Sequence, residues 1–164
     1  KTGALIVIED EILLNEYIRT GIDVDAIVSS QLLINIFEKN TPLHDGAIIM
    51  RGDRIVSATC YLPLSDSLRL SKELGTRHRA AIEVSLNSDA VVVVTSEETG
   101  LISLAVDGKL IRGLTDAELR EKLSSYLLSQ KNSKNKFRSK KNKSEEVAVI
   151  NETAFTESSL PGIT

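Results

Sequence analysis

Short apolar runs alternate with polar and glycine-containing segments along the first three quarters of the chain. The runs at 4–8 and 90–95 are rich in Val and Ile, which is typical of buried strands. Alternating polar and apolar residues at 22–27 predict another strand. Apolar runs on both sides of a Gly-Asp and an Asp-Gly turn predict two hairpins. These hairpins pair 47–50 with 54–61, and 101–106 with 110–114.

Three other stretches have helical spacing. Ser29 or Ser30 is a suitable N-cap for a helix with an apolar face over 32–37. A second helix is expected over 77–86, and a third opens at the capping box Thr115–Glu118 and ends near Leu128. The pattern predicts an α/β domain over 1–128, in which helices flank a central mixed β-sheet of six to seven strands.

Composition changes near Ser129. Residues 1–128 carry 13 Lys/Arg and 19 Asp/Glu, whereas 129–164 carry 7 and 4. The basic residues of this tail all lie in 129–143, and its acidic residues all lie in 144–164. Because the basic part has one large apolar residue, Phe137, we expect a disordered tail, basic and then acidic. Such a tail is usually just solvated, and the alternative is contact with an anionic membrane or an acidic partner.

Length and charge limit the class of protein. A chain of 164 residues predicts one domain. Its net charge of −3 argues against a protein that binds duplex DNA, and we expect no nucleic-acid partner. A single cysteine, Cys60, excludes an internal disulfide framework. No apolar run exceeds five residues, and spanning a bilayer takes about 20. Since the chain begins at Lys1, we expect it to be a piece of a longer protein.

The first candidate site is His44-Asp45-Gly46-Ala47, between a turn and a strand. A carboxylate there can bind Mg²⁺ together with phosphate oxygens and water, and His44 adds a ligand suited to Mn²⁺. The glycine lets a ligand approach the backbone. A turn that simply begins a strand explains the same residues, and spacing alone favours that interpretation.

The second candidate is Gly75-Thr76-Arg77-His78-Arg79 at a predicted helix start. Basic residues in a first turn oppose the helix dipole, so they gain nothing from the helix itself. A phosphate group would resolve this conflict, because helix N-termini and arginines both bind anions. A solvated basic turn is the alternative. If a triphosphate does bind, positive charge is expected to be concentrated at Arg77, His78 and Arg79, together with a metal ion.

The third candidate is Ser96-Glu97-Glu98-Thr99-Gly100, directly after a buried strand. Ligands gather beyond the carboxyl ends of strands, although a polar turn is the simpler interpretation. Core packing is the simpler interpretation of Cys60, Tyr61 and Leu62 as well.

Together, Asp45-Gly46-Ala47, Arg77-His78-Arg79 and the Ser96–Gly100 segment resemble the diadenylate cyclase domain, whose signatures are Asp-Gly-Ala and Arg-His-Arg. The resemblance covers 3–128 and is strongest to membrane-anchored bacterial members. It implies a DisA-N-like fold and the condensation of two ATP to cyclic di-AMP and two pyrophosphates, with Mn²⁺, Mg²⁺ or Co²⁺.

The resemblance also assigns roles to residues. Asp45 would act with the metal ion on the ribose 3′-hydroxyl, beside Gly46 and Ala47, with His44 as a second metal ligand. Leu62 would contact adenine, with Tyr61 beside the base. The triphosphate would be held by the segment Gly75, Thr76, Arg77, His78 and Arg79 and by Ser96, Glu97 and Glu98.

One chain carries one copy of each cluster, whereas the product joins two nucleotides symmetrically. A two-fold homodimer with facing sites is therefore expected. A non-catalytic module that binds or senses ATP or cyclic di-AMP is the main alternative, and a membrane interaction scaffold is another. The resemblance further implies a membrane regulator and phosphoglucosamine mutase as partners. It places the full-length protein at the cytoplasmic face of the membrane, and this piece is expected to be soluble.

Overall fold

The computed structural model describes residues 1–64 and 74–128. Two compact units divide the chain, Lys1–Lys122 and Leu123–Thr164. The first unit contains the strands and helices that are discussed below, and the described part of the second, 123–128, is helical. The predicted tail at 129–164 lies outside the described residues, so its disorder stays a prediction.

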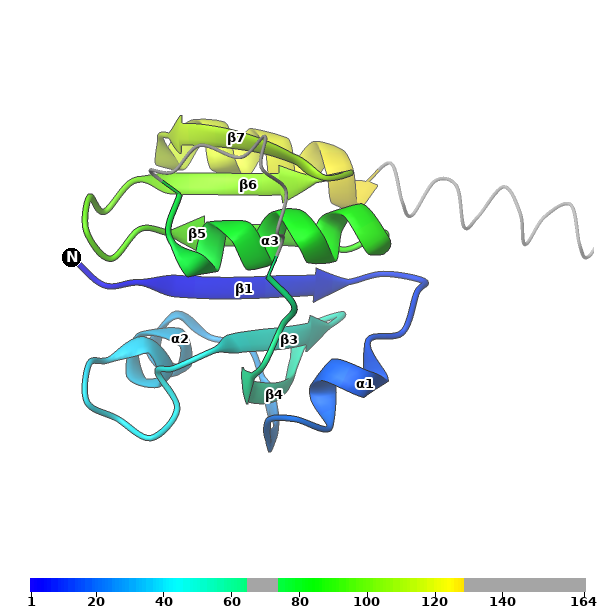
Figure 1. Cartoon of the computed structure of the whole chain (residues 1–164), viewed down its shortest axis with the longest axis vertical. Coiled ribbons are helices and arrows are strands. Elements are labelled where there is room, and N and C mark those ends of the chain that lie inside the picture. The colour runs from blue at the N-terminus through cyan, green and yellow to red at the C-terminus, as the bar shows by residue number, and fades with distance from the viewer. Residues whose placement is uncertain (65–73, 129–164) are drawn as a thin grey trace, which may run out of the picture. The chain divides into compact units, whose positions relative to one another are not determined.

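The described strands of the first unit form one seven-stranded mixed sheet in the order β2-β4-β3-β1-β5-β6-β7 (Figure 1). Strands β1 and β3 pair in parallel, and all other neighbours pair antiparallel. The mixed sheet and both hairpins are therefore confirmed. The strands are β1 (Ala4–Glu9), β2 (Ile22–Ile27), β3 (Ala47–Arg51), β4 (Arg54–Cys60), β5 (Val91–Thr95), β6 (Ile102–Val106) and β7 (Lys109–Leu114).

The predicted helices are present as well. Helix α2 (Ser30–Phe37) is capped by Ser29, whose Oγ accepts a hydrogen bond from the Leu32 amide at 3.2 Å. Helix α3 (Thr76–Asn87) begins one residue earlier than predicted. A final helix covers 116–128. The short helix α1 (Asn15–Ile18) was not predicted, because four residues are too few for a helical period to be visible.

Helices α2 and α3 cover opposite faces of the sheet. Alternate residues of β3 point to opposite faces, and Ile49 packs with the α3 residues Ala81 and Val84. Its neighbour Ile48 packs with Ile36 of α2. The sheet is thus buried on both sides, which is why β5 is a nearly continuous valine run.

Strand register brings the candidate segments to one edge of the sheet. Ala4 at the start of β1 pairs with Thr95 at the end of β5, and Ala47 at the start of β3 pairs with Cys60 at the end of β4. The segment before β3 and the segments after β4 and β5 therefore emerge at the same edge. These are the segments in which the sequence places candidate chemistry.

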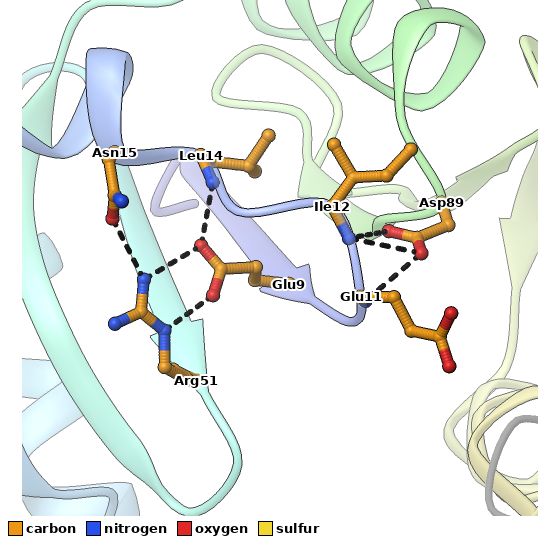
Figure 2. A network of polar contacts seen from close by, with 7 residues as sticks. All are labelled: Glu9, Glu11, Ile12, Leu14, Asn15, Arg51 and Asp89. Atoms are coloured by element: carbon orange, nitrogen blue, oxygen red, sulfur yellow. Dashed lines mark hydrogen bonds and ion pairs between the residues drawn. The ribbon is translucent and has the colours of Figure 1, made fainter. Parts of the chain in front are cut away.

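The opposite edge is fixed by a polar network that has no part in that chemistry (Figure 2). The buried carboxylate of Glu9 accepts hydrogen bonds from the Arg51 guanidinium and, at 2.8 Å, from the Leu14 amide. The carboxylate of Asp89 accepts from the amides of Glu11 and Ile12 at 3.0 and 3.2 Å. These contacts satisfy backbone donors of the 10–14 segment and hold it against the sheet.

Candidate functional site

A cavity of about 590 Å³ lies where α3 begins and β5 ends. It extends from the loop after β5 to strands β6 and β7. Among its lining residues, seven were predicted as site residues: Gly75, Thr76, Arg77, His78, Ser96, Glu97 and Glu98. The other five are Thr95, Thr99, Leu101, Ser103 and Arg112.

The N-terminus of α3 opens on this cavity without a side-chain cap. Its N-cap is Gly75, which has extended backbone and no side chain to accept hydrogen bonds from the first turn. The first turn carries no acidic residue either. Unpaired amides at a helix start attract anions, and phosphate oxygens can accept hydrogen bonds in place of a cap. This end of the cavity is suited to a phosphate group.

An ion-pair chain crosses the rim of the cavity. Arg77 Nη1 donates to Glu97 Oε2 at 2.9 Å, and Lys39 Nζ lies 3.2 Å from Glu97 Oε1. These two cations hold the pKa of Glu97 below its usual range. Lys39 belongs to the segment between α2 and β3, which also carries Asp45. The chain of charges therefore connects the segment between α2 and β3 to the end of the cavity where α3 begins.

Gly3 leaves the space in which Arg77 lies. A methyl group at Gly3 would come within 2.8 Å of Arg77 Nη1 and 3.0 Å of Glu97 Cβ. A larger residue at the start of β1 would therefore press directly on the Arg77–Glu97 pair.

The charge of the cavity differs from the sequence-based expectation. His78 is buried, and burial together with the nearby Arg112 guanidinium lowers the pKa of its imidazole. His78 is consequently neutral at neutral pH and does not add to the positive charge. Arg79 is not among the lining residues. Among the described residues, the cations of the cavity lining are Arg77 and Arg112, and the role of Arg79 in holding a phosphate stays a prediction.

Sequence reasoning missed Arg112 and Ser103 because both lie inside strands. A single arginine in an amphipathic strand has the pattern of a solvent-exposed position. The cross-strand register supplies the signal, because Ser103 is paired with Arg112. Residues directly opposite each other in an antiparallel pair share one face of the sheet.

The remaining predicted residues lie outside the cavity lining. They are His44, Asp45, Gly46, Ala47, Tyr61, Leu62 and Arg79. Asp45 and Tyr61 are exposed, whereas Ala47 is buried in the core. The register of β3 with β4 brings the Asp45 and Tyr61 segments together at the cavity's edge of the sheet.

Gly46 is required by the fold itself. Its φ is +83°, and a Cβ there would lie 2.8 Å from the carbonyl oxygen of Cys60 and 2.9 Å from the carbonyl carbon of Thr59. Both obstacles are backbone atoms that cannot swing away. Glycine therefore allows β4 to approach the residue that follows Asp45.

His44 and Asp45 supply donors that suit a divalent cation. The Nδ1 atom of His44 lies 2.6 Å from the carbonyl oxygen of Thr41. A carbonyl only accepts, so Nδ1 carries the proton and Nε2 keeps its lone pair for a metal ion. The described residues include no group of three or more His, Cys, Asp or Glu that could hold a metal. A carboxylate and an imidazole are ligand types that Mn²⁺ accepts, but an ion held by these two alone would need phosphate oxygens and water to complete its coordination.

Cys60 is a core residue. Its side chain is 1% exposed, and burial raises the pKa of its thiol. A buried, protonated thiol is a poor nucleophile, in agreement with the structural interpretation of this residue.

Residues 1–110 match the family model described as DAC, DisA bacterial checkpoint controller nucleotide-binding. The chain belongs to this family. Among curated DAC relatives, it is 54% identical over 123 residues to cyclic di-AMP synthase CdaA of Bacillus subtilis. It is also 54% identical over 129 residues to diadenylate cyclase of Listeria monocytogenes. These matches cover 75% and 79% of the chain but 45% and 47% of the relatives, so the chain spans about half of their length.

Solved structures agree with this DAC assignment. A double mutant of DacA from Staphylococcus aureus is 53% identical and superposes with a TM-score of 0.74, covering 76% of this chain and 83% of the other. A protein from Bacillus cereus named a hypothetical membrane spanning protein is 47% identical, with a TM-score of 0.66 over 69% and 55% of the chains. The expected DAC fold is thereby confirmed. In the described part of this DAC chain, no helix is both long and apolar enough to cross a membrane.

Proposed function

We propose that this chain is the catalytic region of a diadenylate cyclase, which condenses two ATP molecules into cyclic di-AMP and two pyrophosphates. The observation that carries the proposal is the uncapped start of α3, with Arg77 beside it, in a cavity joined through Glu97 and Lys39 to the Asp45 segment. A phosphate-binding end and a carboxylate are the two parts that a nucleotidyl transfer needs. The names of the curated relatives support the same activity.

The triphosphate would lie against the first turn of α3. Amides of this turn and the hydroxyls of Thr76 and Ser96 donate to phosphate oxygens, and Arg77 exchanges Glu97 for phosphate. Glu98, also at the wall, orients groups around the phosphates. These contacts neutralise the charge that develops on the leaving pyrophosphate.

The nucleophile would be the ribose 3′-hydroxyl, held on the Asp45 side of the edge. Adenine would lie against Leu62 and Tyr61, which follow β4. Asp45 orients the hydroxyl and accepts its proton, while Asp45 and His44 Nε2 would hold a divalent cation, Mn²⁺ or Mg²⁺. When bound, this cation would lower the pKa of the hydroxyl and shield phosphate charge.

Two copies of the chain are needed for the complete reaction. One cavity of this size accommodates one nucleotide, yet cyclic di-AMP contains two identical bonds between two nucleotides. In a two-fold dimer each 3′-hydroxyl attacks the α-phosphate held by the other copy. The two reactions are then equivalent by symmetry.

We propose that the full-length protein lies at the cytoplasmic face of the membrane, and the name of one similar structure, a membrane spanning protein, supports a membrane location. A membrane regulator and phosphoglucosamine mutase are the partners that we propose there. Co-purification of the full-length protein with the membrane fraction, and with each partner, tests this location.

The proposal predicts that Asp45→Asn abolishes cyclic di-AMP formation while leaving ATP binding within about threefold. The amide keeps the size of the side chain but cannot accept the proton or bind the cation well. The Asp45→Asn variant and the unsubstituted chain should be assayed with ATP and Mn²⁺. The product is identified by mass spectrometry, and nucleotide binding is measured by calorimetry. Since Asp45 is exposed, its replacement should not disturb folding, and Asp53→Asn in the β3–β4 turn is a matched control. Full turnover by Asp45→Asn would disprove the assignment of Asp45.

A further inference from the structure

The cavity continues past the α3 N-terminus onto strands β6 and β7, where no residue has yet been given a function. Ser103 of β6 and Arg112 of β7 line this part of the wall. They are paired in register and lie on the same face of the sheet as α3, since Ala105 of β6 packs into the α3-side core. A hydroxyl and a guanidinium are thus presented together at this end of the cavity.

The hydroxyl of Ser103 is buried and unsatisfied. The residue is 1% exposed, and its Oγ has no hydrogen-bond partner within the described protein. Leaving a buried hydroxyl unpaired is costly, and most such groups in proteins are satisfied. Because Ser103 lines the cavity, a ligand atom that accepts a hydrogen bond can satisfy it there.

Arg112 provides charge in the same place. Within residues 1–64 and 74–128 it is part of no ion pair, in contrast to Arg77, which is paired with Glu97. Its guanidinium lies close enough to His78 to lower the pKa of that imidazole. The neutral His78 ring can donate one N–H, so a hydroxyl, an imidazole and a guanidinium all line this cavity as possible donors. A fully ionised anion such as a phosphate matches this donor set.

The order of the strands indicates which phosphate group of a bound nucleotide would reach Ser103 and Arg112. Along the edge, β4 carries the adenine-binding residues, followed by β3, β1 and β5, and then β6 and β7. A nucleotide that starts at β4 and passes the α3 N-terminus beside β5 brings its last phosphates toward β6. Strand β7 is two strand spacings beyond β5, or about 10 Å, and an extended arginine side chain reaches back over much of this distance.

We infer that Ser103 and Arg112, together with His78, form a subsite for the terminal phosphates of the triphosphate, and therefore for the leaving pyrophosphate. This inference rests on the proposed function, since it assumes that the nucleotide lies along this edge with its base at β4. It gives the enzyme a way to distinguish ATP from AMP. The contacts are made to the group that leaves, so they favour departure of pyrophosphate.

Binding measurements without turnover test the subsite. The probes are α,β-methylene-ATP, whose α–β bridge resists cleavage, inorganic pyrophosphate and AMP. We expect Arg112→Gln to weaken binding of α,β-methylene-ATP and pyrophosphate roughly tenfold to hundredfold and to leave AMP within about twofold. Ser103→Ala should weaken the same two probes by a smaller factor and should not lower the melting temperature, because it removes an unpaired buried group.

Lys109→Gln is the matched control. Lys109 lies on β7 and is exposed, and its replacement also removes one positive charge, but the residue is not part of the cavity wall. It should leave all three affinities within about twofold. The inference would be overturned if Arg112→Gln weakened the binding of AMP and of α,β-methylene-ATP equally, or if it weakened the binding of neither. A chain that shows the expected losses but makes no cyclic di-AMP would refute the proposed function and keep the subsite.

Discussion

At the scale of single residues, the two signature clusters are fixed by different physical constraints. Gly46 is held by geometry, because its positive φ and the backbone of β4 leave no room for a side chain. Arg77 is held by charge, between the start of α3 and Glu97. Both residues were predicted from the sequence as site residues. For Gly46 the predicted reason was close approach of a ligand to the backbone, and the structure adds a second reason, the close approach of β4.

Gly46 and Gly52 allow these constraints to be separated. Both have positive φ, but a Cβ at Gly52 would meet no atom within 4 Å. We expect Gly52→Ala to lower the free energy of unfolding by about 1 kcal/mol and Gly46→Ala by roughly 3 kcal/mol or more, because the second also forces β4 away. Urea denaturation of both variants measures the difference. Equal losses would show that the close approach of β4 at Gly46 is easily relaxed.

His78 predicts how stability depends on pH. Its pKa is lowered in the folded protein, so the unfolded chain binds a proton more readily than the folded one. Stability should therefore be unaffected by His78 well above pH 6.5 and should fall as the pH drops through that value. His78→Gln should show a shallower fall between pH 7 and 5.5 in chemical denaturation. An unchanged slope would mean that the imidazole accepts a proton freely in the folded state.

Arg112 marks the limit of sequence reasoning at this scale. Arg77 was predictable because basic residues in a first helical turn oppose the dipole, which is a local conflict. Arg112 breaks no local rule, since an arginine suits an exposed strand position. Its place in the cavity depends on the pairing of β6 with β7 and on the packing of α3, and neither is contained in a local pattern.

At the scale of elements, local patterns predicted most of the fold. The two hairpins follow from their Gly-Asp and Asp-Gly turns, and α2 begins at the predicted serine cap. The parallel pairing of β1 with β3 and the antiparallel pairing of β1 with β5 were beyond prediction, because these strands are far apart in sequence. Those pairings bring Asp45 and Ser96 to one edge, so the site depends on contacts that hydrophobic periodicity does not reveal.

The capping box at the start of helix 116–128 is a prediction that the structure confirms. Thr115 Oγ1 accepts from the Glu118 amide at 3.3 Å, and the Glu118 carboxylate accepts from the Thr115 amide at 2.8 Å. The amide and the hydroxyl of Thr115 both donate to the Glu118 carboxylate, and these two hydrogen bonds lower its pKa.

We expect Thr115→Ala to destabilise the chain by about 1 kcal/mol, because an amide at the helix start loses its acceptor. Thr115→Ser keeps the hydroxyl and should retain most of the stability. Thermal unfolding followed by circular dichroism at 222 nm compares the two variants. An alanine variant as stable as the serine variant would mean that the cap contributes little here.

At the scale of the whole molecule, the proposed function requires an acidic domain to bind a highly charged anion. Residues 1–128 have more acidic than basic residues, yet the cavity wall combines a helix N-terminus with Arg77 and Arg112. Local arrangement of charge therefore matters more than net charge for this ligand. The Asp45 segment at the same edge is where we propose that a divalent cation binds.

Under the proposed function, one copy of the chain is insufficient for the whole reaction. Each chain would contribute one copy of the Asp45 segment and of the cavity at the start of α3, whereas cyclic di-AMP requires two identical bond-forming steps. The proposed pair of facing copies follows from the symmetry of that product. No pattern of residues in a single chain specifies which surfaces meet.

The most direct test is to incubate the purified chain with ATP and Mn²⁺ and to identify the products by liquid chromatography and mass spectrometry. Our account predicts cyclic di-AMP, with about two pyrophosphates released for each molecule formed, as the reaction's atom balance requires. ATP that binds but is recovered unchanged, by a chain confirmed to be folded and dimeric, would contradict the account and favour a nucleotide-sensing module.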